Sequence, residues 1–337
     1  QFWTLSTSIL AVMHPHRLLC WFLARNPGIE FDADCFANLQ VNRSATERRA
    51  LSYGSRRSIK REQQAAWLLK AITLIDLTTL AGDDTAARVR RLCAKAKNPL
   101  SQNLRQQLGL KDIPISTAAV CVYHDMIKPA AQSLAGTGIH LAAVSTGFPA
   151  GLSPLPLRLK EIDYAVADGA NEIDIVISRR HVLEGNWRAL YDEVKAMREA
   201  CGQAHIKTIL ATGELGTLTN IAKASMVCMM AGADFIKTST GKETTNATLP
   251  VSLTMVRAIR EYMAMTDYQV GFKPAGGVAD TKTALLYMTM MKEELGLRWL
   301  QPDLFRFGAS SLLGDIERQL DHFASGYYSA AYRHSMG

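Results

Sequence analysis

The stretch Asp234-Phe-Ile-Lys237-Thr-Ser-Thr-Gly241-Lys242 places a lysine inside an apolar run that ends at a glycine turn. A second stretch, Val270-Gly-Phe-Lys273-Pro-Ala-Gly276-Gly277, repeats this arrangement. An ammonium group is costly to bury in a hydrophobic strand, so such a lysine is either paired or held close to neutrality for chemistry. Two lysines that converge on one pocket would be an amine nucleophile and its activating cation, which favours carbonyl chemistry through a Schiff base.

Short β-rich segments alternate with longer helical segments from residue 71 onward. Helical periodicity is clear over residues 157–168 and 186–201, which end at Gly169 and Gly202. We expect strands at residues 72–78, 118–123, 140–145, 172–177, 205–211, 234–238, 269–273 and 304–307. Eight β-then-α repeats predict one closed parallel (β/α)₈ TIM barrel. A doubly wound open sheet is the alternative, but it would carry a glycine-rich dinucleotide fingerprint after its first strand, where this chain has Leu77-Thr-Thr-Leu-Ala-Gly-Asp-Asp.

The barrel pattern also divides the chain. Residues 26–70 precede the first expected strand and predict one or two helices, which Gly54 and Ser55 interrupt. We expect this N-terminal helical arm to pack on the bottom of the barrel, which occupies residues 71–325. Residues 326–337 form a C-terminal tail, and residues 1–25 are an extension that the pattern does not interpret.

Composition indicates a globular protein, because 337 residues with 48% hydrophobic content can bury a large core. The formal net charge of +7 is concentrated in residues 43–61, where seven basic residues accompany the single acid Glu47. Such a basic arm could contact phosphate or an acidic partner. No aromatic or groove-reading pattern accompanies it, so a solvated helical face is favoured and no nucleic-acid partner is expected.

The six cysteines include no CxxC pair and no Cys/His cluster with metal-ligand spacing. This pattern argues against a disulfide framework and against a zinc site, and it fits a reducing cytoplasm. The apolar run of residues 18–24 is too short to span a bilayer, so no membrane association is expected. A weak signal or transit sequence is the competing interpretation, although no clear small-residue cleavage site is present.

Glycines and hydroxyls follow the last three expected strands. Gly241-Lys242 follows the sixth strand, Gly276-Gly277 the seventh, and Phe307-Gly308-Ala-Ser310-Ser311 the eighth. Each turn alone is compatible with a plain βα connection. In a (β/α)₈ barrel, however, phosphate is typically held by the loops after strands seven and eight, where glycine frees backbone N–H groups. Three such loops together predict a phosphate site.

Buried carboxylates are expected beside the lysines. Asp174 lies in the fourth strand between apolar neighbours and therefore requires a partner, and Asp76 is a similar case in the first strand. A purely structural ion pair with Lys237 or Lys273 is the alternative to a catalytic role. Lys207 is a third strand lysine, so position alone does not identify the nucleophile.

Cys121 ends the second expected strand. A thiol nucleophile would need an activating histidine, and His124, three positions on, is turned to the opposite face. A buried or pocket-lining cysteine is therefore favoured.

Taken together, the motifs resemble those of the class I deoxyribose-phosphate aldolases, over about residues 26–332 and most closely the longer, animal-type members. The resemblance rests on Leu74-Ile-Asp-Leu-Thr-Thr-Leu, Glu172-Ile-Asp-Ile-Val-Ile, Ala211-Thr-Gly-Glu-Leu, Asp234-Phe-Ile-Lys-Thr-Ser-Thr-Gly-Lys, Gly271-Phe-Lys-Pro-Ala-Gly-Gly and Arg306-Phe-Gly-Ala-Ser-Ser-Leu-Leu. It implies reversible cleavage of 2-deoxy-D-ribose 5-phosphate to D-glyceraldehyde 3-phosphate and acetaldehyde, in deoxyribonucleoside catabolism. It also implies that no cofactor or metal is needed and that a homo-oligomer is possible.

The resemblance further implies roles for individual residues. Lys237 would form the Schiff base, Lys273 would lower its pKa, and Asp174 would join Lys273 in a proton relay through water. Asp76 would contact the hydroxyl region of the substrate. The phosphate would lie on Gly241, Gly276, Gly277, Gly308, Ser310 and Ser311, and the remaining pocket residues would be Cys121, Lys207 and Thr238.

Two departures from the family pattern stand out. Tyr123-His124-Asp125 lacks the proline that many relatives carry after the second strand, which predicts a less restrained loop. Some members place a C-terminal tyrosine in the active site, and here the candidates are Tyr327, Tyr328 and Tyr332. The alternatives to an aldolase are another lysine-dependent barrel enzyme, such as a decarboxylase or a transaldolase-like transferase, and a catalytically silent scaffold that binds through its basic arm.

Overall fold

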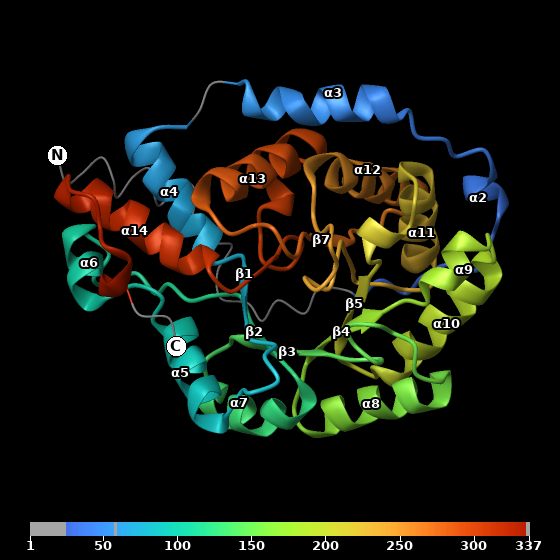
Figure 1. Cartoon of the computed structure of the whole chain (residues 1–337), viewed down its shortest axis with the longest axis horizontal. Helices are drawn as coiled ribbons and strands as arrows, with labels where there is room; N and C mark the ends of the chain where they lie inside the picture. The colour runs from blue at the N-terminus through green and yellow to red at the C-terminus, as the bar shows by residue number, and fades with distance from the viewer. Residues whose placement is uncertain (1–24, 57–58, 335–337) are drawn as a thin grey trace.

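The predicted barrel is present in the computed structural model, which describes residues 25–56 and 59–334. Eight parallel strands follow the order β7-β6-β5-β4-β3-β2-β1-β8. Isolated bridges from Phe272 to Phe305 and from Ala275 to Gly308 connect the β7 and β8 segments, so that the barrel is nearly closed (Figure 1). The strands are β1 Ile75–Thr78, β2 Ala119–Val122, β3 His140–Val144, β4 Glu172–Val176, β5 His205–Ile209, β6 Phe235–Lys237, β7 Gly271–Lys273 and β8 Phe307–Ala309.

Helices surround the strands (Figure 1). Within the described residues, none is long and apolar enough to cross a membrane. Four short 3₁₀ turns also occur among these residues: η1 His124–Met126, η2 Thr212–Glu214, η3 Leu297–Trp299 and η4 Ala331–Arg333. The α-helices are α2 Asp34–Ala37, α3 Arg43–Gly54, α4 Arg61–Ile72, α5 Ala86–Lys97, α6 Gln102–Gln107, α7 Ile127–Leu134, α8 Leu155–Ala167, α9 Arg179–Leu183, α10 Trp187–Ala200, α11 Leu218–Met230, α12 Leu249–Thr266, α13 Thr281–Leu295 and α14 Leu312–Ser325.

Local sequence explains where several barrel helices begin. Thr85, Thr217, Thr248 and Asp280 each precede a helix, and each side chain accepts a hydrogen bond from the backbone N–H three residues further on. Such N-caps satisfy a donor that the first helical turn leaves free. Because every one of these caps ends a connection that follows a strand, it fixes the upper loops from which a barrel enzyme builds its active site.

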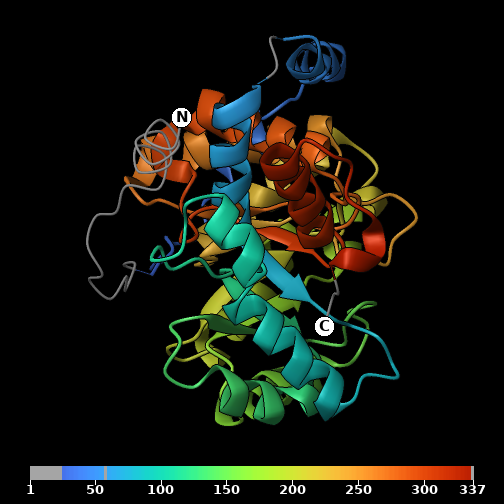
Figure 2. The same cartoon turned by 90° about the vertical axis from the view of Figure 1, so that its left-hand side faces the viewer.

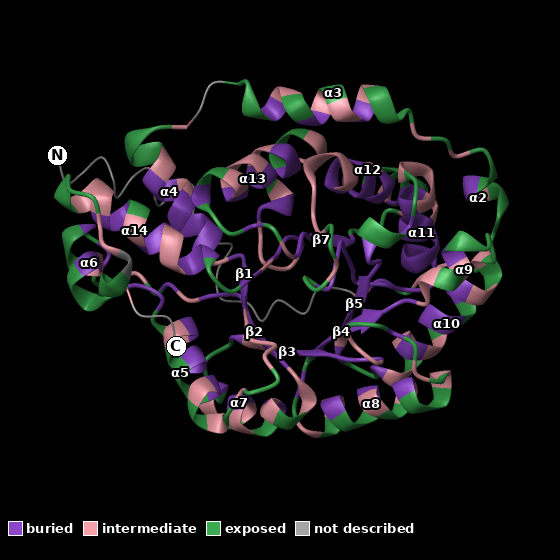
Figure 3. Ribbon diagram, viewed as in Figure 1, coloured by how far each residue is buried: buried purple, intermediate pink, exposed green. Residues whose placement is uncertain are grey.

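The core lies between the strands and the inner faces of the helices, and Figure 3 shows buried strands inside helices whose outer faces are exposed. In α5 the buried residues Val89, Leu92, Cys93 and Ala96 recur three and four positions apart, which is one face of a helix. The strands, buried on both faces, consist almost entirely of buried residues. This pattern is the one expected of a parallel sheet that helices cover.

Element boundaries differ most from expectation at the first and last strands. The expected helices at 157–168 and 186–201 are confirmed as α8 and α10, but β8 begins at Phe307, where the predicted strand ended. The expected position of Gly308 in a turn after the strand is wrong, because Gly308 pairs with Asp76 inside the sheet. The first strand begins at Ile75 rather than Ile72, because Ile72 is the last residue of helix α4, whose C-terminal part is buried.

The N-terminal arm contains three helices rather than one or two, and α3 ends at Gly54 as predicted. Helix α3 packs along α12 and α13, and α4 packs against α13 and α14. Figure 2 shows α3 outside the ring of barrel helices. The arm thus packs on the barrel through α12, α13 and α14, and the expectation that it covers the bottom of the barrel stays a prediction.

Asn26 does reach the bottom of the barrel. The residue is 3% exposed, and its side-chain amide donates to the carbonyl oxygens of Met229, at 2.8 Å, and Ala233, at 2.9 Å. Its amide oxygen accepts from the hydroxyl of Tyr262 at 3.0 Å. Its backbone N–H donates to the carboxylate of Asp234, at the entrance to β6, at 2.9 Å. This single residue therefore fastens the start of the arm to the connection between α11 and β6.

Replacing Asn26 by alanine would leave the Met229 and Ala233 carbonyl groups buried without their partner. We expect the Asn26→Ala variant to lose about 2 to 4 kcal/mol of unfolding free energy, because each buried polar group that loses its hydrogen bond is costly. Urea unfolding followed by circular dichroism measures the loss. The exposed Asn38 provides the matched control, and equal stability of the Asn26→Ala and Asn38→Ala variants would contradict the role assigned to Asn26.

Candidate active site

The two strand lysines meet in the interior of the barrel. Lys237 and Lys273 are direct partners in the register of β6 and β7. Their Nζ atoms lie 2.7 and 2.8 Å from the same oxygen, Oδ2 of Asp174 on β4. The sequence prediction that the lysines share one face with this carboxylate is confirmed.

A deeper layer of charge supports this triad. Lys273 also donates to Asp76 at 2.5 Å, and Lys207 donates to Asp174 at 3.0 Å and to Glu172 at 2.5 Å. Arg306 bridges Asp76, at 2.6 Å, and Glu172, at 2.8 Å. Hydrogen bonds thus link all seven side chains into one network, and each is at most 3% exposed as a whole residue.

The composition of this network determines which group gives up its proton. It contains four basic side chains, Lys207, Lys237, Lys273 and Arg306, but only three carboxylates, those of Asp76, Glu172 and Asp174. With every group ionised, the closed interior would carry one uncompensated positive charge, which is expensive in a medium of low dielectric constant. Lys237 is the basic group with a single carboxylate partner, so it loses its proton most readily.

The pKa shifts follow this geometry. Burial lowers the pKa of Lys237, the carboxylate of Asp174 opposes the shift, and the ammonium of Lys273 adds to it, so the pKa lies below its usual value. Burial acts in the same direction on Lys273, but Asp174 and Asp76 outweigh it and raise its pKa. The pKa of Asp174 is held well below its usual range, because three lysines offset the effect of burial. The arrangement therefore provides a nucleophilic amine beside a permanent cation.

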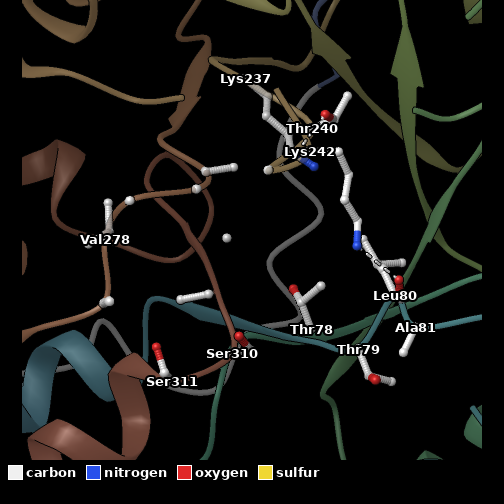
Figure 4. A pocket seen from close by; sticks show the side chains of 17 residues that line it. Thr78, Thr79, Leu80, Ala81, Lys237, Thr240, Lys242, Val278, Ser310 and Ser311 are labelled. Atoms are coloured by element: carbon white, nitrogen blue, oxygen red, sulfur yellow. Dashed lines mark hydrogen bonds between the residues drawn. The ribbon is translucent and has the colours of Figure 1, made fainter. Parts of the chain in front are cut away.

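The side chain of Lys237 lines a pocket of about 380 Å³ at the upper end of the barrel (Figure 4). The loops after β1, β6, β7 and β8 form its wall, and all six residues expected to hold phosphate lie in it. The lining residues are Thr78, Thr79, Leu80, Ala81, Lys237, Thr240, Gly241, Lys242, Ala275, Gly276, Gly277, Val278, Ala279, Gly308, Ala309, Ser310 and Ser311.

Two glycines are required by close packing around this pocket. Gly276 has φ +73°, and a Cβ atom there would lie 2.6 Å from the side chain of Asn246. A Cβ atom on Gly308 would lie 2.9 Å from the Cβ of Ala275 and 3.2 Å from the Cε of Lys273. A larger residue at position 308 would thus displace the lysine that acts as the permanent cation.

The eighth-strand loop leads directly into a helix. Ser310 and Ser311 line the pocket, and α14 begins at Leu312 with Ser311 as its N-cap residue. The side chain of Ser311 forms no capping hydrogen bond. The hydroxyl group and the free N–H groups of the first turn therefore lie at the positive end of the helix dipole, which is an environment suited to a phosphate.

The other expected pocket residues lie away from the pocket lining. Lys207 belongs to the buried network, and the hydroxyl of Thr238 accepts from the backbone N–H of Ala275 at 3.0 Å, which ties β6 to the β7 loop. Cys121 is 1% exposed, and burial raises the pKa of its thiol to about 11. The expected buried cysteine is confirmed. It packs with Ala142 and Val144 in an apolar cluster inside the barrel, against Leu80, Tyr123 and Phe148.

The structure places both segments in which the sequence departs from the family pattern. The segment after Tyr123 forms η1, in which the backbone N–H of Met126 donates to the Tyr123 carbonyl at 3.0 Å. Tyr327, Tyr328 and Tyr332 are exposed and do not line the pocket, and Tyr328 stacks on His322 of α14. Residues 1–24 of the uninterpreted extension and 335–337 of the tail lie outside the described residues.

Sequence reasoning assigned no role to Glu172 or Arg306. Strand alternation was the available signal, because Glu172 lies two residues before Asp174 and Arg306 lies two residues before Gly308, on the same interior face. Within the described residues, no group of three or more histidine, cysteine, aspartate or glutamate side chains is arranged to hold a metal ion. The carboxylates inside the barrel are instead engaged by lysine and arginine.

Comparisons with known proteins agree with this geometry. A family model described as DeoC/LacD family aldolase matches residues 70–313. The deoxyribose-phosphate aldolase of Homo sapiens is 56% identical over 309 residues, which are 91% of this chain and 97% of the relative. That of Mus musculus is 58% identical over 305 residues, which are 90% of this chain and 96% of the relative. The solved tetrameric deoxyribose phosphate aldolase of Aeropyrum pernix shares the fold, with a TM-score of 0.55 at 23% identity over 83% of this chain and 99% of its own.

The buried network leads to a stability prediction. Arg306→Met would remove the partner of two carboxylates, Asp76 and Glu172, and we expect a loss of about 3 kcal/mol of unfolding free energy. Arg43 is a matched control, because its pair with Glu47 is on the surface and the Arg43 side chain is 81% exposed. Arg43→Met is expected to leave chemical denaturation unchanged. Equal denaturation midpoints for the two variants would refute the importance of the Arg306 contacts.

Proposed function

Because the chain belongs to the DeoC/LacD aldolase family, we propose that it cleaves 2-deoxy-D-ribose 5-phosphate reversibly to D-glyceraldehyde 3-phosphate and acetaldehyde. The observation that carries this proposal is the lysine pair, in which a lowered pKa on Lys237 accompanies a raised pKa on Lys273. A lysine amine without its proton attacks an aldehyde carbon, and a phosphate-sized glycine cradle beside it selects a phosphorylated sugar.

The first step is formation of a Schiff base. The neutral Nζ of Lys237 attacks C1 of the open-chain sugar, and the carbinolamine loses water to give a protonated imine. Lys273 keeps its proton throughout, because Asp174 and Asp76 hold it in the charged form. Its positive charge disfavours protonation of Lys237 before the attack.

Carbon–carbon cleavage follows from the positive charge on the imine. A base removes the proton of the 3-hydroxyl group, the bond between C2 and C3 breaks, and its electron pair moves onto the imine to give an enamine. C3 becomes the aldehyde carbon of glyceraldehyde 3-phosphate. A bound water held by Asp174 and Lys273 takes the proton from the 3-hydroxyl and delivers one to C2, while Lys273 itself stays protonated, and hydrolysis then releases acetaldehyde from Lys237.

The phosphate contacts follow from the pocket. The N–H groups of Gly241, Gly276 and Gly277 and the hydroxyls of Ser310 and Ser311 surround the phosphate, while the α14 N-terminus attracts its charge. Gly308 lines the same pocket, but its N–H donates to the Pro274 carbonyl at 3.0 Å, so it contributes space rather than a hydrogen bond. Asp76 orients Lys273 through their hydrogen bond. It is fully buried and does not line the pocket, so its contact with the hydroxyl region of the sugar stays a prediction from the resemblance. Phosphate at one end and the imine at the other hold the C2–C3 bond in place, which gives the entropic advantage of a fixed geometry.

The basic arm offers little support for a binding scaffold as the alternative function. Arg49 and Arg56 of this arm pair with Glu293, and Arg49 also pairs with Glu294. These pairs engage two of the seven basic residues that suggested an acidic partner. A homo-oligomer and a cytoplasmic location remain proposals, which rest on the resemblance to the family and on the cysteine pattern.

Borohydride trapping with acetaldehyde tests the assigned nucleophile. We expect a reduced adduct on the peptide that contains Lys237, and no cleavage by the Lys237→Met variant, whose fold should persist because methionine is an apolar side chain of similar length. Lys70 is the matched control, since burial lowers its pKa to about 8 but it lies on α4, where it donates to Gln301. Lys70→Met should retain cleavage and labelling. An adduct on Lys273 or Lys207 with none on Lys237 would overturn the assignment.

Removal of Lys273 should change the pH profile in a defined direction. The network would then hold three cations and three carboxylates, so Lys237 would keep its proton and its pKa would rise. Because the reaction needs the neutral amine, the acidic limb of the rate profile for Lys273→Met should move to higher pH, with a lower maximum. Lys128 is the control, because its side chain is 70% exposed and pairs with Asp168 on the surface. The Lys128→Met variant should leave the acidic limb of the rate profile at its original pH. A limb that stays unchanged in Lys273→Met would contradict the role of this cation.

A further inference from the structure

The loop after β1 forms one wall of the pocket. Thr79, Leu80 and Ala81 line it, opposite the glycine loops. The Leu80 side chain packs against the apolar cluster around Cys121. The backbone carbonyl of Leu80 accepts a hydrogen bond from the Nζ of Lys242 at 3.3 Å (Figure 4). Lys242 follows β6, so this bond, which we call the Lys242–Leu80 bridge, joins the β6 loop to the β1 loop along one edge of the pocket.

Asp84 holds this wall from behind. Its side chain is 5% exposed, and it does not line the pocket. The hydroxyl of Thr79 donates to both of its carboxylate oxygens, at 2.8 and 2.9 Å, and the backbone N–H of Ala81 donates to one of them at 3.1 Å. The two residues on either side of Leu80 are therefore bound to one carboxylate. Arg88 of α5 adds a third donor at 3.3 Å.

The loop after β6, which carries Lys242, is also fixed by a carboxylate. The backbone N–H of Thr240 donates to both carboxylate oxygens of Glu243, at 3.0 and 3.1 Å, and the Thr240 hydroxyl accepts from the backbone N–H of Lys242 at 3.0 Å. Each loop thus has its own carboxylate, and the bond between Lys242 and Leu80 joins the two. The position of the Leu80 carbonyl depends on Asp84, because the two neighbours of Leu80 are fixed by it.

We propose that Asp84 is a positioning residue for substrate binding, which sets the β1-side wall of the pocket and presents the Leu80 carbonyl to Lys242. It acts through Thr79, Leu80 and Ala81 and does not touch the reacting atoms. This inference rests on the proposed function, since it assumes that a phosphorylated sugar occupies the pocket. Loss of Asp84 would leave the imine chemistry at Lys237 intact but would widen and loosen the opposite wall.

Steady-state kinetics of the full chain with 2-deoxyribose 5-phosphate provides the test. We expect Asp84→Ala to raise KM about fivefold with kcat changed less than about twofold, because the lost contacts act on binding rather than on the bond-breaking step. Asp84→Asn keeps an acceptor oxygen for the Ala81 N–H and should give an intermediate KM. Borohydride trapping of acetaldehyde on Lys237 should be equal in all variants.

Asp83 supplies the matched control. It is the preceding residue in the same loop, its side chain is 78% exposed, and it contacts Arg88 at 3.1 Å without binding Thr79 or Ala81. Asp83→Ala should have the KM of the unchanged protein. An equal rise in KM for Asp83→Ala and Asp84→Ala, or a fall in kcat at constant KM, would overturn the inference. If Asp84→Ala is unstable, the Asp84→Asn comparison decides in the same way.

The outcomes separate this inference from the proposed function. A Lys237→Met variant that still cleaves substrate would overturn the proposed mechanism whatever Asp84 does. A Lys237→Met variant without activity, together with unchanged KM in Asp84→Ala, would leave the mechanism intact and remove only the positioning role.

A double variant tests the path through the bridge. In a Lys242→Met background, Asp84→Ala should raise KM by a smaller factor than it does in the unchanged protein, because part of its effect is already lost. If Asp84→Ala raised KM by the same factor in both backgrounds, the effect of Asp84 would not depend on the hydrogen bond between Lys242 and the Leu80 carbonyl.

Discussion

The interior of this barrel contains one more basic side chain than it has carboxylates to balance. Asp76, Glu172 and Asp174 are shared among Lys207, Lys237, Lys273 and Arg306, and the seven side chains are buried together. A closed parallel sheet excludes the water that would otherwise screen such an excess, so the excess is relieved where a proton is held least firmly. The reactive amine is thus a product of the whole network rather than of one neighbouring cation.

Barrel geometry sets the distances on which this balance depends. Lys237 and Lys273 are register partners on adjacent strands, whereas Asp174 reaches both from β4 across the interior. A shift of one residue in either strand would turn a lysine into the apolar layer beneath the helices. Close packing at Gly308 and the pairing of β8 with β1 keep the strands in this register, so stability and reactivity rest on the same contacts.

Much of the fold and of the site was predictable from sequence, for a physical reason. Alternating apolar segments with glycine and capping residues specify a barrel locally, and a charged residue in an apolar strand marks the interior. The same signal was present at Glu172 and Arg306 but was overlooked, because one lay at the start of a strand and the other at a predicted boundary. Boundaries were least accessible: α4 and β1 share one apolar run, and only the packing of Ile72 into a helix ends it. The placement of the arm beside α12, α13 and α14 depends on long-range contacts that no local pattern encodes.

The apolar cluster of Cys121, Ala142 and Val144 occupies the part of the barrel interior that the charges leave free. Its members make no ion pair within the network, so exchanges of volume among them disturb packing without unbalancing charge. Redesign of the chain to accept a longer donor aldehyde can therefore treat these two groups of interior side chains differently. Side chains of the apolar cluster can be substituted, whereas the lysines hydrogen-bonded to Asp174 have to be kept.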